Sequence, residues 1–101
     1  LGVNYKKNIE AFCEVNLKEF GYILTEENRL KILNLMRLKG EITIKDVEQL
    51  LGFSGTNAYY HLSLMTKSGM VVTRYEGRTV FYRISNSYIE KVFLEISKYC
   101  R

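Results

Sequence analysis

The chain has 101 residues, of which 47% are hydrophobic and 26% are charged. This composition is typical of one folded domain and excludes a disordered chain, and no apolar run approaches the roughly 20 residues that a membrane-spanning helix needs. The 15 Lys and Arg against 11 Asp and Glu give a net charge of +4, which permits a polyanionic partner without requiring one.

Cys13 and Cys100 are the two cysteines of the chain and lie near its opposite ends. No pattern typical of a secretory signal is present, so we expect reduced thiols and a cytoplasmic protein without a membrane partner. The sequence has no proline, repeat or linker, and we expect residues 1–101 to form a single domain. A longer protein stays open as an alternative, because the chain begins at Leu1 rather than at Met.

Two amphipathic helices are predicted before Gly40. A helix over about residues 5–21 is indicated by apolar residues at helical spacing, namely Tyr5, Ile9, Phe12, Cys13 and Phe20. Thr25 is a suitable N-cap for the second helix, with Glu26 and Glu27 near its positive end. We expect the second helix to bury a stripe of Leu30, Leu33 and Met36, widened by Ile32 and Leu35.

A short third helix is predicted after the segment "EITI", residues 41–44, which is itself a small strand or an extended segment. Thr43 and Asp46 form a capping-box pattern, with Asp in place of the usual Glu or Gln. The helix covers "IKDVEQLL", and we expect it to bury Ile44, Val47, Leu50 and Leu51.

A tight turn joins this short helix to a longer one. Gly52 ends the first helix, Ser54 is a good N-cap for the second, and the second runs over about residues 55–67 before Gly69 ends it. A short helix and a longer helix joined by a Gly-containing turn are the signature of a helix-turn-helix.

A β-hairpin and a closing helix complete the chain. The runs "MVVTRY" and "RTVFYRI" flank Glu76 and Gly77, which predicts a hairpin. Its second strand turns Val80, Tyr82 and Ile84 toward the core. A capping-box pattern of Ser87 and Glu90 starts a helix over about residues 87–100, with an apolar stripe of Ile89, Val92, Phe93, Ile96 and Cys100. We therefore predict a mainly α fold with a small β-hairpin wing, a winged helix-turn-helix with additional N- and C-terminal helices.

The helix over 55–67 has two chemically different sides. At 100° per residue, Ala58, Leu62 and Met65 share one narrow arc, while the opposite side carries hydroxyls, phenols and a lysine. Such a side suits the major groove of DNA. The predicted DNA contacts of this segment are Ser54, Thr56, Asn57, Tyr59, Tyr60, Ser63 and Lys67. As alternatives, the Tyr59 ring packs on a neighbour, and Thr56 and Asn57 only satisfy the helix start.

Arg74 and Arg78 flank the hairpin turn, and their guanidinium groups are predicted to reach the DNA backbone or an adjacent minor groove. The alternative is a pair of solvated arginines. His61 lacks a helical partner for catalysis or metal binding, so we expect a structural role in which it bridges the helix to the wing or contacts a phosphate. No nucleophile–base pair, phosphate-binding Gly loop or metal constellation is present, and we predict neither an enzyme nor a cofactor.

Residues 28–84 resemble the ArsR-type winged-helix repressors. The segments that carry the resemblance are "RLKILNLM", "GEITIKDVEQLLGFS", "YHLSLMTKSGMV" and "RYEGRTVFYRI". The resemblance implies a repressor that binds specific double-stranded DNA sequences, usually as a homodimer joined through its first and last helices. The residues that would form this dimer interface are Ile9, Phe12, Cys13, Val92, Phe93 and Ile96. Alternatively, these apolar stripes close the core of a monomer.

The sequence departs from the family at its metal sites. The Cys-x-Cys pair that many relatives carry in the third helix is absent, and the last helix has no histidine, so no metal site carries over. A thiol switch between Cys13 and Cys100 is an alternative to two buried free thiols. We therefore predict a sequence-specific transcriptional regulator whose operator and effector the sequence does not name. The alternative function is a winged-helix module for protein interactions.

Overall fold

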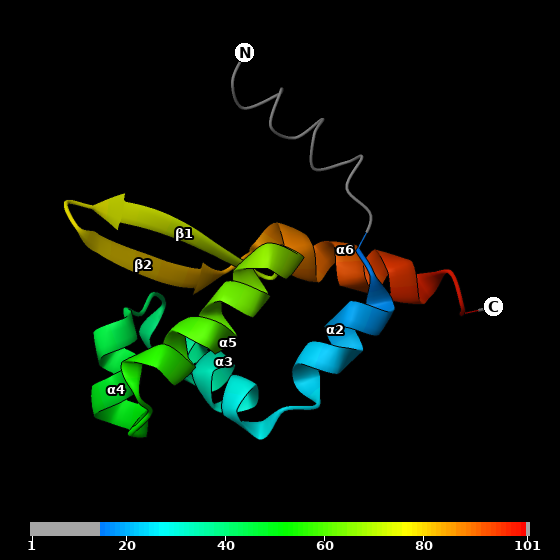
Figure 1. Ribbon diagram of the computed structural model, residues 1–101. Helices are drawn as coiled ribbons and strands as arrows, with labels where there is room; N and C mark the ends of the chain where they lie inside the picture. The colour runs from blue at the N-terminus through cyan, green and yellow to red at the C-terminus, as the bar shows by residue number, and fades with distance from the viewer. Residues whose placement is uncertain (1–14, 101) are drawn as a thin grey trace, which may run out of the picture.

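The computed structural model describes residues 15–100, which form five helices and one hairpin (Figure 1). Their order is α2 (Leu17–Leu24), α3 (Glu27–Lys39), α4 (Ile44–Leu51), α5 (Gly55–Ser68), β1 (Val71–Glu76), β2 (Thr79–Ile84) and α6 (Asn86–Ser97). The hairpin projects on one side of α5, and α2 and α6 lie on the other side (Figure 1). This arrangement confirms the predicted mainly α, winged helix-turn-helix fold.

The predicted helix boundaries at the start of the described residues are wrong. Residues 15 and 16 are not helical, so one helix cannot span 5–21. Asn16 caps α2 by accepting a 3.0 Å hydrogen bond from the Glu19 N–H, since a short polar side chain competes with the backbone for helix-end donors. Thr25 does not cap the second helix. Its hydroxyl donates to the Tyr22 carbonyl at the end of α2, and Glu26 caps α3 instead.

The core lies between α3, α5 and the hairpin. Ile32 and Met36 of α3 are buried together with Ala58, Leu62 and Met65 of α5. Leu35 is buried as expected and Leu33 partly so, but Leu30 is 44% exposed. The buried face of α3 is rotated so that Arg29, only 3% exposed, enters the interior in place of Leu30.

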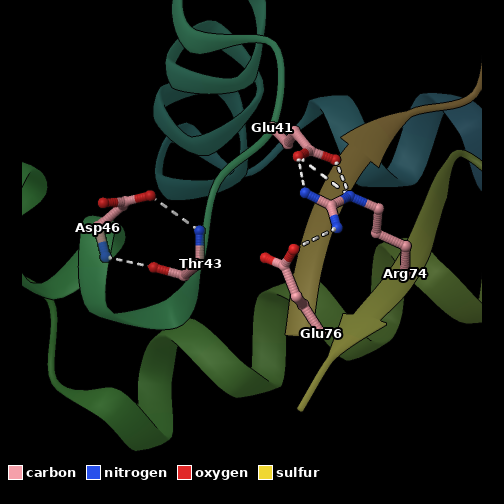
Figure 2. Close-up of polar contacts among 5 residues, drawn as sticks. All are labelled: Glu41, Thr43, Asp46, Arg74 and Glu76. Atoms are coloured by element: carbon pink, nitrogen blue, oxygen red, sulfur yellow. Dashed lines mark hydrogen bonds and ion pairs between the residues drawn. The ribbon is translucent and has the colours of Figure 1, made fainter. Parts of the chain in front are cut away.

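The start of α4 confirms the predicted capping box. The Asp46 N–H donates to Thr43 Oγ1 at 3.1 Å, and the Thr43 N–H donates to the Asp46 carboxylate at 3.0 Å (Figure 2). Val47 is fully buried, Ile44 and Leu51 are partly buried, and Leu50 is 57% exposed, contrary to expectation. Gly52 ends α4 with a left-handed φ of 76°, a conformation that costs glycine little.

The hairpin is antiparallel, with Glu76 paired to Thr79. Its turn residues are therefore Gly77 and Arg78, one position later than predicted, and Gly77 has the positive φ of 61°. Of the strand residues predicted to face the core, Tyr82 is buried, and Val80 and Ile84 are partly buried and pack against the core. Residue Ile42 of "EITI" exchanges two backbone hydrogen bonds with Tyr82, at 2.9 and 2.8 Å, which confirms a small extended segment there.

Helix α6 begins at Asn86, and its N-cap is Ser85 rather than Ser87. The Ser85 hydroxyl accepts from the Tyr88 N–H at 3.2 Å. The Tyr88 ring lies 6.2 Å from that of Phe20 and so connects α6 to α2. α6 ends at Ser97, a few residues earlier than expected.

Candidate nucleic-acid interface

The recognition helix α5 is held at both ends by its caps. The Ser54 hydroxyl accepts from the Asn57 N–H at 3.1 Å, and Gly69 ends the helix with a φ of 91°. Ser54, a predicted DNA contact, therefore also fixes the first turn. Its side chain is exposed, as is that of Thr56, whereas Asn57 is partly buried.

The outward side of α5 has the composition that the helical wheel predicts. Tyr59 is 59% exposed and Tyr60 is 54% exposed, and Lys67 is exposed on the same helix. Ser63 is partly buried. The division of α5 into a core side and a polar outer side is thus confirmed, and the phenol rings stand outside the core.

His61 has the structural role predicted for it, but its hydrogen-bond partner is neither the wing nor a phosphate. It is 5% exposed, and its Nδ1 lies 3.3 Å from Arg29 of α3, so it joins the recognition helix to α3. Burial, and then the nearby guanidinium charge, lower the pKa of His61 below 6.5. The ring also meets Tyr60 edge-on, with centroids 5.1 Å apart.

Arg74 is occupied by contacts within the chain. Its Nε and one terminal nitrogen donate to the Glu41 carboxylate at distances from 2.6 to 3.1 Å, and another lies 3.9 Å from Glu76 (Figure 2). The guanidinium also stacks 4.3 Å from the Phe81 ring. The hydrogen bond from Arg74 holds the pKa of Glu41 below its usual value. Arg78 is exposed at the turn and makes no ion pair within residues 15–100.

A groove of about 330 Å³ separates α5 from the hairpin, and we call it the α5–wing groove. Tyr59, Ser63, Thr66 and Lys67 line it on the side of α5. The hairpin contributes Thr73, Tyr75, Val80 and Tyr82. Thr73 and Tyr75 were not among the predicted contacts, although the alternation of β1 places both on the same face as the buried Val71.

The predicted dimer residues fall into three groups. Ile9, Phe12 and Cys13 lie outside the described residues. Val92 is 3% exposed and belongs to the chain's own core, whereas Phe93 and Ile96 are 66% and 40% exposed on α6. Leu94, which was not predicted, is 63% exposed beside them, and Cys100 is exposed.

The described residues have neither a candidate metal site nor a helix that could span a membrane. Residues 15–100 contain no group of three His, Cys, Asp or Glu side chains that could hold a metal ion. No helix in this range is long and apolar enough to cross a bilayer.

A recognition helix with a polar outer side, preceded by a short helix and followed by a hairpin wing, defines a winged helix-turn-helix protein. The family described as winged helix-turn-helix DNA-binding matches residues 25–72. A cadmium resistance transcriptional regulatory protein CadC homolog from Staphylococcus aureus is 32% identical over 93 residues, covering 88% of this chain and 77% of the relative.

Two solved structures extend the similarity. HlyU from Vibrio cholerae superposes with a TM-score of 0.64 at 27% identity, covering 95% of this chain and 98% of HlyU. A homodimeric winged helix-turn-helix DNA-binding domain from Mycobacterium bovis superposes with a TM-score of 0.66 at 27% identity, covering 80% of this chain and 74% of that domain. The chain belongs to the ArsR family of winged helix-turn-helix transcriptional regulators. It is a DNA-binding transcriptional regulator, from a family of regulators rather than of enzymes.

Proposed function

We propose that the chain is a homodimeric repressor that reads its operator with α5 in the major groove and with the wing on the DNA backbone. The observation that carries the proposal is the polar outer side of α5, where Tyr59 and Tyr60 are more than half exposed. Phenols, hydroxyls and an amide donate and accept hydrogen bonds at base edges and phosphates. The proposed contacts are Ser54, Thr56, Asn57, Tyr59, Tyr60, Ser63, Lys67 and Arg78.

Arg74 has a different role in this proposal. Arg74 donates hydrogen bonds to Glu41 and lies close to Glu76, so the positive charge of Arg74 is partly compensated within the chain. Arg74 therefore sets the position of the wing, and Arg78 at the tip is the principal wing contact with the backbone.

The dimer is supported by exposed apolar side chains on α6. Phe93, Leu94 and Ile96 stand out from a helix whose Tyr88 and Val92 already fill the core. Large exposed apolar side chains that cluster on one element mark an interaction surface. The similar Mycobacterium bovis domain is a homodimer. A two-fold dimer would place its half-sites about 10 base pairs apart, and a protein that reads an operator would act in the cytoplasm.

Selection of DNA fragments tests this function. The protein is incubated with fragments of its own genome at low and moderate salt, beside a Tyr60→Ala, Arg78→Ala variant. A control variant, Tyr99→Ala, Lys18→Ala, also loses one tyrosine and one positive charge. We expect one palindromic sequence to be enriched by the wild type and the control and lost in the first variant. Weak, equal binding of all fragments by all three proteins would instead favour a protein-interaction module.

A further inference from the structure

The α5–wing groove is chemically uniform. Every side chain that lines it ends in a hydroxyl or an ammonium group, except that of Val80, and no carboxylate lines it. Lys67 makes no ion pair with any carboxylate of residues 15–100. The groove therefore offers one unpaired positive charge among hydroxyl groups, of which that of Thr66 already donates to the Leu62 carbonyl.

Tyr82 gives the groove a polar floor. The residue is 6% exposed, and its hydroxyl makes no hydrogen bond within residues 15–100. Burial raises the pKa of Tyr82, and the neighbouring phenols of Tyr59 and Tyr75 raise it further, so the three phenol groups lie near one another. Among the described residues only the Tyr88 hydroxyl is fully buried without a partner. The Tyr82 hydroxyl is therefore accessible, and it can donate a hydrogen bond to an occupant of the groove.

The occupant that fits this chemistry is an anion whose surface consists of hydrogen-bond acceptors. A phosphodiester has two such oxygens, shares one negative charge between them and has no donor of its own. Ammonium and hydroxyl groups are typical phosphate contacts of DNA-binding proteins. The groove also lies between the two elements that are proposed to contact DNA, α5 and the hairpin.

We propose that the α5–wing groove holds a backbone phosphate of the bound DNA, with Lys67 supplying the charge and the hydroxyls of Tyr75 and Tyr82 donating hydrogen bonds. This inference rests on the proposed function. It adds the two wing tyrosines to the DNA interface and assigns Lys67 to the backbone rather than to a base. A free phosphate group has the same chemistry, and the experiment below distinguishes the two sources.

The test is binding to a duplex of arbitrary sequence, because a backbone contact does not depend on the operator. Fluorescence anisotropy at several salt concentrations compares the wild type with Tyr75→Phe, Tyr82→Phe and Lys67→Gln. The matched controls are Tyr99→Phe, which removes a hydroxyl at the end of the chain, and Lys18→Gln on α2, which removes the same charge. Circular dichroism checks that every variant is folded.

We expect each Tyr→Phe change in the groove to weaken duplex binding by about threefold to tenfold, while Tyr99→Phe leaves it unchanged. Lys67→Gln should reduce the slope of log affinity against log salt by about 0.9, and Lys18→Gln should not. If all variants bind the duplex like the wild type, the groove assignment is wrong while the regulator function stands. If the wild type binds no duplex even at low salt, both fail.

Inorganic phosphate provides the second arm. Amide shifts of the labelled protein are followed while phosphate is added, with chloride at equal ionic strength as the reference. Under the proposal, phosphate causes only small changes in the amide signals of the groove residues. The duplex changes the signals of the same residues and displaces the phosphate. Tight binding of phosphate together with tyrosine variants that bind DNA normally would identify a site for a free anion and overturn the DNA assignment.

Discussion

The guanidinium of Arg29 lies 3.3 Å from Nδ1 of His61, and this contact joins α3 to the recognition helix inside the core. Arg29 also donates from Nε to the Ile23 carbonyl at 3.0 Å and from a terminal nitrogen to the Tyr22 carbonyl at 3.2 Å. Both carbonyls belong to the end of α2, where the helix dipole is negative. Arginine has only donors, so Nδ1 of His61 must be unprotonated and accept.

The stability of the fold should therefore fall between neutral pH and pH 5.5. His61 is the only histidine of the chain, and its pKa is lowered in the folded state from 6.5. Above 6.5 it is neutral in both states and the full stability is present. Below 6.5 the unfolded chain binds a proton that the folded chain resists, so stability is lost as the pH falls toward the folded pKa, by at most about 1.4 kcal/mol per pH unit.

Urea unfolding of the wild type and of His61→Gln at several pH values measures this effect. The variant should be less stable at pH 7.5 because it removes the Nδ1 that faces Arg29 and the ring that fills the core. Its stability should change little between pH 7.5 and 5.5, because it has no imidazole to titrate. An equally steep pH dependence in the variant would show that another group is responsible.

Thr43→Ala should destabilise the protein by about 1 kcal/mol, because it removes the hydroxyl that accepts from the Asp46 N–H at the start of α4. The matched control is Thr56→Ala, in the exposed first turn of α5, where alanine is at least as favourable for the helix as threonine. Denaturant midpoints compare the two variants. Equal midpoints for both would argue against the capping contribution.

Arg74→Gln should weaken binding to duplex DNA less than Arg78→Gln does. The two variants lose the same charge, but Arg74 is already paired with Glu41, whereas Arg78 has no ion-pair partner among the described residues. Anisotropy titrations should show a salt slope lowered by about 0.9 for Arg78→Gln. A larger loss for Arg74→Gln would mean that Arg74 leaves Glu41 when DNA binds.

Phe93→Asp should convert the proposed dimer into a folded monomer, since a carboxylate would be buried in the apolar interface on α6. Leu38→Asp is the control, because Leu38 is 65% exposed on α3, outside the proposed interface. Sedimentation velocity measures the mass of both variants, and circular dichroism confirms their folding. A wild type that sediments as a monomer at high micromolar concentration would contradict the dimer.

Local patterns predicted the parts of the fold that local energetics decide. The wheel of Ala58, Leu62 and Met65 gave the correct buried side of α5, and the spacing of Thr43 and Asp46 gave the correct start of α4. The predicted helix starts were wrong where two residues that both suit an N-cap lie within a few positions of each other. Ser85 and Ser87 both suit an N-cap. Ser85 is the N-cap of α6 because it follows directly on the last residue of β2, Ile84.

Contacts between residues that are far apart in the sequence could not be predicted from local patterns. Arg29 and His61 are 32 positions apart, and Arg74 and Glu41 are 33 apart. In the sequence, Arg29, Arg74 and Glu41 each have the pattern of a surface residue, and His61 lies at the margin of the buried side of its helix. No periodic pattern therefore indicates that these residues form pairs. The exposure of Leu30 follows from the same fact, because the burial of Arg29 sets the rotation of α3.

The two backbone hydrogen bonds between Ile42 and Tyr82 have a consequence for how DNA is chosen. They attach the wing to the segment that leads into α4, so the hairpin cannot swing freely about its base. The distance between recognition helix and wing is then set before DNA arrives, which lowers the entropy lost on binding. A protein built in this way should discriminate among DNA sequences by groove width and stiffness as well as by base edges, because the DNA rather than the wing has to adapt.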